Sequence, residues 1–128
     1  MSKSKTFRLG DLQLRMMKVL WERGETTVAE MHKALAGEGD LAYTTVATML
    51  RKMEGRSLVD HRMEGRSFVY RASVAADAVT RGMADHLLER LFAGSLSDMV
   101  SHLLSRREIS REELSKLERL IAERKRIP

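Results

Sequence analysis

One stretch of the sequence, residues 43–53, reads YTTVATMLRKM and decides the fold. On an α-helix, at about 100° per residue, this stretch separates into two faces. The face that needs a core is apolar and holds Val46, Met49, Leu50 and Met53. The other face carries hydroxyl groups and long cations but no acid, and holds Thr44, Thr48, Arg51 and Lys52, with Thr45 at its edge. Such a face suits phosphates and base edges in a DNA groove, although ordinary amphipathic surface helices share the pattern.

The sequence before residue 24 predicts a first helix. Apolar side chains recur there at helical spacing, at Leu9, Leu12, Met16, Val19 and Leu20. Asp11 lies near the expected start, where the helix dipole favours an acid, and Gly24 supplies a stop. We therefore expect a scaffold helix over residues 11–23, in which Trp21 serves only packing.

A second, shorter helix is predicted between the first helix and the opening stretch. Residues 27–30, Thr-Val-Ala-Glu, match the capping box, and we expect the helix that they begin to end at Gly37. Residues 37–42 then read as a turn. Two short helices joined by a glycine-containing turn, the second with a polar and basic face, indicate a helix-turn-helix, although any small helical bundle could look similar.

The sequence that follows the opening stretch changes to the alternation typical of strands. Residues 57–63 and 66–71 are the two strand-like runs, and the Glu-Gly pair at residues 64–65 suits a two-residue hairpin turn. A hairpin directly after a recognition helix is a wing. Arg62 and Arg66 flank its expected tip and could reach a phosphate or the minor groove. The alternative is that these cations only protect a sheet edge against strand addition.

The chain from residue 73 onward is predicted to be helical again. Apolar residues continue at helical spacing, Gly94 interrupts them, and Ser95 and Ser110 each open a further helix. Three short helices have little interior of their own, so we expect the apolar stripe to be buried in a symmetric homodimer. The expected dimerisation residues are Leu87, Leu88, Leu91, Phe92, Leu96, Met99, Val100, Leu103, Leu104, Leu117, Leu120 and Ile121.

The composition limits the classes of protein that fit. The net charge is +5, and the excess lies early: residues 1–72 hold 13 Lys and Arg against 9 Asp and Glu, whereas residues 73–128 hold 10 against 9. The chain has no Cys, which excludes disulfides, thiolate nucleophiles and cysteine zinc sites. No apolar run approaches the roughly 20 residues that span a bilayer, and no secretory signal is recognisable. We expect a cytoplasmic protein without a membrane partner.

Residues suited to catalysis or metal binding do not converge in the sequence. The four histidines are His32, His61, His86 and His102. Asp85, His86 and Glu89 are close enough for a metal site, but ordinary surface side chains explain them better. A glycine-rich phosphate loop and a nucleophile elbow are also missing. The sequence predicts neither an enzyme nor a cofactor.

Four segments together resemble the penicillinase repressor family. Residues 17–22, 27–32, 42–53 and 64–71 read MKVLWE, TVAEMH, AYTTVATMLRKM and EGRSFVYR. The resemblance implies a homodimeric winged-helix repressor that binds a short inverted repeat in a promoter. The residues expected at double-stranded operator DNA are Tyr43, Thr44, Thr45, Thr48, Arg51, Lys52, Arg62 and Arg66.

Two departures from the family pattern concern the inducing signal. Copper-responsive members carry a cysteine pair near the C-terminus, whereas this chain has no Cys. β-Lactam-responsive members are cut at an Asn-Phe bond just before the last helix, where this sequence has His102-Leu103. The resemblance allows a regulatory protease as a partner, but the residues at the expected cleavage site do not match the family pattern. The inducing signal stays open.

The predicted fold is mainly α with a small β-hairpin. A winged helix-turn-helix domain over residues 1–72, with recognition helix 43–54 and wing 57–71, precedes a short helical dimerisation domain over residues 73–128. The function expected is sequence-specific repression of transcription. Two alternatives are a winged helix that binds a protein partner and a regulator of the same fold that senses a small molecule.

Overall fold

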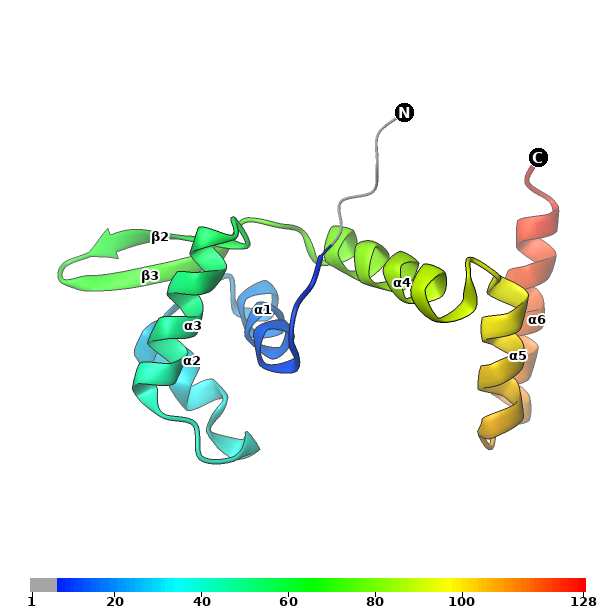
Figure 1. The fold of residues 1–128 in the computed structure, drawn as a ribbon, viewed down its shortest axis with the longest axis horizontal. Coiled ribbons are helices and arrows are strands. Elements are labelled where there is room, and N and C mark those ends of the chain that lie inside the picture. The colour runs from blue at the N-terminus through cyan, green and yellow to red at the C-terminus, as the bar shows by residue number, and fades with distance from the viewer. Residues whose placement is uncertain (1–6) are drawn as a thin grey trace. The chain divides into compact units, whose positions relative to one another are not determined.

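The computed structural model describes residues 7–128, which Figure 1 shows as a ribbon. Within these residues the chain forms six α-helices, a short 3₁₀ turn and an antiparallel sheet of three strands. The predicted class, mainly helical with a small β-hairpin, is confirmed. The chain divides into two compact units, the second of which begins at Leu87. None of the helices within residues 7–128 is long and apolar enough to cross a membrane.

The first two helices begin as the sequence predicts. Helix α1 spans Asp11–Arg23 and ends at Gly24, whose φ of 91° is accessible mainly to glycine. Helix α2 spans Val28–Ala34 and starts with the expected capping box. The amide of Glu30 donates to Thr27 Oγ1 at 3.1 Å, and the amide of Thr27 donates to Glu30 Oε1 at 2.8 Å. These bonds lower the pKa of the Glu30 carboxyl group.

The connection between α2 and the recognition helix differs from the predicted turn. Helix α2 ends at Ala34, and a 3₁₀ turn, η1 (Ala36–Glu38), follows it. The helix therefore ends three residues before Gly37, where we expected it to end, and Gly39 in the segment that follows has a φ of 111°. Helix α3 then spans Tyr43–Gly55, in agreement with the predicted recognition helix.

The sheet contains one strand more than the predicted hairpin. Strands β2 (Val59–Glu64) and β3 (Ser67–Ala72) form the hairpin, and β1 (Glu25–Thr27) pairs antiparallel with β3. The sheet order is β1-β3-β2. Because Glu64 pairs with Ser67, the two-residue turn is Gly65-Arg66 rather than Glu64-Gly65. Gly65 has a φ of 62°, as the first turn position of a type II′ turn requires.

The core of the first unit lies between helices α1, α2 and α3 and the inner face of the sheet. Methionine contributes strongly, because its flexible side chain fills irregular gaps between helices. Trp21 packs against this core and donates its Nε1–H to the carbonyl of Val74 at 2.8 Å, which ties α1 to the segment after β3. The fully buried side chains are Met16, Met17, Leu20, Thr26, Met31, Val46, Leu50, Met53, Val59, Tyr70 and Val79.

Thr26, in the middle of β1, supports a prediction about stability. Thr26 is 1% exposed, and its hydroxyl oxygen forms no hydrogen bond with any of the described residues. A buried hydroxyl without a partner is unfavourable, and valine keeps the same shape. We expect Thr26→Val to raise the free energy of unfolding by about 1 kcal/mol in urea denaturation. The neighbouring Thr27→Val, which removes a helix cap, should lower it by about 1 kcal/mol. A loss of stability in Thr26→Val would contradict this account.

The chain after the sheet forms three helices. Helix α4 spans Ala76–Phe92, α5 spans Leu96–Arg106 and α6 spans Arg111–Lys125. Ser95 and Ser110 cap α5 and α6 by accepting hydrogen bonds from backbone amides three residues later. The first unit extends to His86, because the first half of α4 packs on the first core through Val79.

Candidate nucleic-acid interface

Helix α3 exposes the face that the sequence predicts for DNA. Val46, Leu50 and Met53 are fully buried, and Met49 packs against the same core. The apolar side therefore anchors the helix and fixes which side chains face the solvent. The exposed side chains on the opposite side are Thr44, Thr45, Thr48, Arg51 and Lys52. This side of α3 offers hydroxyl groups and two cations to a ligand.

The N-terminal end of α3 is suited to an anion. Its N-cap is Ala42, which has no capping side chain, and its first turn contains no acid. The first amides of an α-helix have no acceptor within the helix and carry partial positive charge, so a phosphate group would fit there. His32 Nε2 lies 2.7 Å from the carbonyl oxygen of Leu41, and the His32 ring meets Tyr43 edge-on at 5.8 Å between centroids. These contacts hold the turn that leads into α3.

A groove of about 330 Å³ separates the wing from α3, and we call it the wing groove. It brings two predicted cations to one place, since Arg51 of α3 and Arg66 of the hairpin turn both line it. Tyr43 lines it as well and is 49% exposed. The sequence did not indicate the other lining residues, which are Thr27, Val28, Ala29, Ala47, Ser67, Phe68 and Tyr70.

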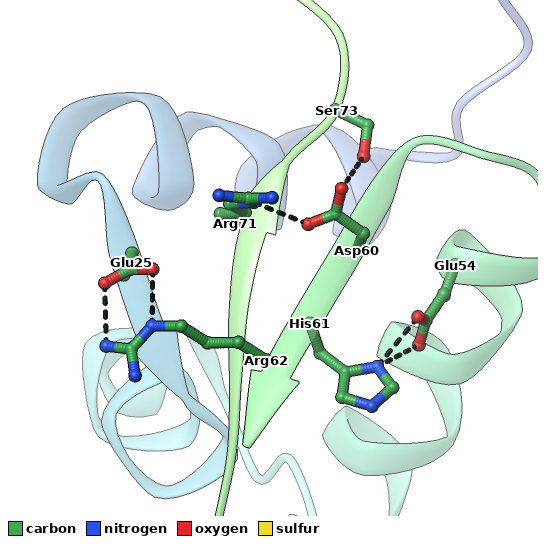
Figure 2. A network of polar contacts seen from close by, with 7 residues as sticks. All are labelled: Glu25, Glu54, Asp60, His61, Arg62, Arg71 and Ser73. Atoms are coloured by element: carbon green, nitrogen blue, oxygen red, sulfur yellow. Dashed lines mark hydrogen bonds and ion pairs between the residues drawn. The ribbon is translucent and has the colours of Figure 1, made fainter. Parts of the chain in front are cut away.

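The inner face of the hairpin contacts the C-terminal end of α3. His61 Nδ1 lies 2.7 and 2.9 Å from the two carboxylate oxygens of Glu54 (Figure 2). The imidazole stacks on Phe68, with 4.0 Å between ring centroids and 5° between ring planes. The ring of Tyr70 lies on the same face, with 5.7 Å between its centroid and that of the His61 ring. Residues two apart on a strand share a face, so Phe68 and Tyr70 lie together, and His61 joins them because it pairs with Tyr70 across the hairpin.

The outer face of the hairpin holds Arg62 in a different environment from Arg66. Arg62 donates two hydrogen bonds of 3.0 Å to Glu25 of β1 (Figure 2). Its guanidinium group also lies 2.9 Å from the Glu64 carboxylate. Hydrogen bonding to Arg62 lowers the pKa of the Glu25 carboxyl group. Arg62 and His61 are neighbours in β2 and therefore point to opposite faces of the sheet. Two carboxylates thus compensate the charge of Arg62 on the face away from α3.

A second ion pair lies on the same outer face. Arg71 Nε donates to Asp60 at 2.7 Å, and Ser73 donates to the other oxygen of Asp60 at 3.2 Å (Figure 2). Hydrogen bonding to Arg71 lowers the pKa of the Asp60 carboxyl group. Together with the Arg62 and Glu25 pair, these contacts link the three strands. The outer face is therefore an ion-paired surface, whereas Arg51 and Arg66 of the wing groove form no ion pair with a residue in the range 7–128.

The second unit exposes most of the apolar residues that the sequence assigns to dimerisation, although Leu88, Phe92, Met99 and Leu117 are half-buried. The α5 and α6 helices contain no buried residue, and Leu91 and Leu96 are 63% and 64% exposed. A groove of about 580 Å³ runs between these two helices, and we call it the α5–α6 groove. Its apolar lining residues are Val100, Leu103, Leu104, Ile109 and Leu117. The His102-Leu103 bond lies inside α5.

Comparison with known proteins identifies the family. The family model described as penicillinase repressor matches residues 9–123, which is most of the chain. The chain belongs to the penicillinase repressor family. Membership makes it a DNA-binding transcriptional repressor with a winged-helix fold. A relative from Mycobacterium tuberculosis, the transcriptional regulator BlaI, is 35% identical over 122 residues, which cover 94% of this chain and 87% of the relative.

Two solved structures of BlaI repressors are similar to part of this chain. The DNA-binding domain of the repressor BlaI is 28% identical, with a TM-score of 0.51 over 59% of this chain and 93% of that domain. The monomeric form of Bacillus licheniformis BlaI, in complex with the blaP half-operator, is also 28% identical. Its TM-score is 0.50, over 58% of this chain and 90% of that chain. The winged-helix class predicted from the sequence is thereby confirmed.

Proposed function

We propose that this chain is a homodimer that represses transcription by binding an inverted repeat in promoter DNA. The observation that carries the proposal is the exposed, hydroxyl-rich and basic side of α3, which continues into the wing groove at Arg51. In this arrangement α3 enters the major groove, with Thr44, Thr48 and Lys52 at base edges or phosphates. The protein would act in the cytoplasm, where promoter DNA lies.

The wing contributes a phosphate contact in the proposed complex. Arg66 occupies the hairpin turn and lines the same groove as Arg51, so a DNA backbone that passes the groove meets both guanidinium groups. Tyr43 at the start of α3 lies beside that path. Arg62 is left out of the proposed interface, because Glu25 and Glu64 already bind its guanidinium group.

The homodimer is supported by the exposed apolar side chains of the second unit. A surface of leucine, isoleucine and valine is costly in water and is stabilised when a second copy covers it. Each protomer would then present one α3, and the two helices would read half-sites about 34–36 Å apart along the duplex. The function proposed is therefore binding to DNA and not catalysis.

The structure gives little support for a regulatory protease as a partner. The His102-Leu103 bond lies within α5, where backbone groups are already hydrogen bonded to one another. Cleavage there would require local unfolding of α5. We therefore propose the operator and a second copy of the chain as partners and assign no role to a protease.

The proposed function predicts salt-dependent and sequence-selective binding. A labelled duplex selected by the wild-type protein from a randomised pool should bind at least about a thousandfold more tightly than a duplex of mixed sequence. Affinity for both should fall steeply with salt, because phosphate contacts release counterions. Fluorescence anisotropy at several salt concentrations measures both effects. Equal affinity for the two duplexes would favour the alternative of a protein-binding winged helix.

A further inference from the structure

Glu54 is an unusual residue in the recognition helix, because it is the only acid of α3. It lies at the C-terminal end of the helix, where the backbone carbonyls already add partial negative charge. In the proposed complex the DNA backbone runs past the wing groove, and Arg51 and Tyr70 line that groove. Glu54 does not line the groove itself, but its charge acts on Tyr70, so a bare carboxylate there would repel phosphate groups near the groove. Helix α3 therefore binds DNA well only if another side chain compensates the negative charge of Glu54.

His61 is the side chain that contacts this carboxylate. Its Nδ1 lies within 2.9 Å of both Glu54 oxygens, and Phe68 stacks against its ring. The side chains of His61 and Glu54 are 27% and 32% exposed, so both are partly shielded from water. The pair joins the wing to the recognition helix, because His61 belongs to β2 and Glu54 to α3.

The charged and titratable groups around the pair come from three elements. On α3 these are Glu54 itself and Arg51, both of which act on the buried Tyr70 hydroxyl of β3. On β2, the carboxylate of Asp60 interacts with His61 but is held by Arg71 and Ser73. Of these two carboxylates, Glu54 is therefore the one whose hydrogen-bond partner is His61.

We propose that His61 is a positioning residue that couples the wing to α3 and makes DNA binding dependent on protonation. This inference rests on the proposed DNA-binding function. Through Nδ1–H, the imidazole holds Glu54 in both charge states, but only the protonated ring neutralises it. The Glu54 carboxylate repels bound phosphates less when the ring is charged, so affinity for DNA should rise as pH falls.

The test compares the pH dependence of DNA affinity between about pH 5.5 and pH 8, the range in which histidine changes charge. The probe is the labelled duplex selected by the wild-type protein. From pH 5.5 to pH 8, the DNA affinity of the wild type should fall by a factor about three to ten times larger than the factor by which the affinity of His61→Gln falls. His86→Gln, which removes a histidine outside the winged helix, serves as the matched control and should keep the wild-type profile. Thermal melting at each pH verifies that each variant is folded.

A second variant separates the electrostatic role of the pair from a purely structural one. Glu54→Gln removes the repulsive carboxylate, so at pH 8 it should bind at least as tightly as the wild type. His61→Gln should instead bind more weakly than the wild type at pH 6. A merely structural contact would make both variants weaker by a similar factor at every pH, and that result would overturn the inference, as would a wild-type profile in His61→Gln. If the wild-type protein does not select any duplex, the proposed function itself fails.

Discussion

The Arg51→Ala variant should bind its selected operator duplex at least about thirty times more weakly than the wild type. Arg51 lies on the exposed side of α3 and lines the wing groove together with Arg66. A contact from such a residue to a phosphate or a guanine edge contributes about 1–3 kcal/mol, and a homodimer makes it twice. The residue is exposed and pairs with no carboxylate in the described structure, so the substitution leaves the core of the winged helix intact.

The matched control for this prediction is Arg124→Ala. It removes the same charge from the exposed last turn of α6, in the second unit. The two variants have the same net charge, so a difference between them reports the place of the arginine and not the total charge. Anisotropy titrations at moderate salt should leave Arg124→Ala within about twofold of the wild type, as expected for a surface charge outside the proposed interface. Equal losses in both variants would contradict the placement of α3 on DNA.

The part of the fold that sequence predicts well is governed by local periodicity. Helix α3 was predicted almost to its ends, because Val46, Leu50 and Met53 must be buried together and Gly55 follows them. The capping box at Thr27 fixed the start of α2 for a similarly local reason. Exposure of the polar side of α3 then follows from burial of the other side.

The parts that sequence analysis missed depend on contacts between distant residues. Strand β1 has three residues and exists because it pairs with β3, more than forty positions later. The hairpin turn shifted by one residue, since cross-strand pairing of Glu64 with Ser67 decides the register. The shift places Arg66 in the turn, while β1 supplies the carboxylate that binds Arg62. Two arginines that looked equivalent in the sequence therefore have different environments.

The second large effect is expected at Leu91, in the C-terminal half of α4. Leu91→Asp should convert the dimer to monomers, with dimer affinity reduced at least about a hundredfold. The side chain is 63% exposed in the single chain, so the carboxylate remains in water when the protomer is alone. In the proposed dimer the same carboxylate would be buried without a partner in both copies. The substitution therefore penalises association much more than it penalises the folding of the first unit.

Sedimentation equilibrium measures this change directly, and Ser101→Asp is the control. Ser101 is exposed on α5, on the side away from Val100, Leu103 and Leu104, so the same charge there should leave the dimer intact. Loss of the dimer should also weaken binding to the full inverted repeat by about a hundredfold or more, because two linked half-site contacts become separate events. Binding to a single half-site should change little, since the first unit keeps its own core. A Leu91→Asp monomer that still bound the full repeat as tightly as the wild type would show that the second unit does not serve operator binding through dimerisation.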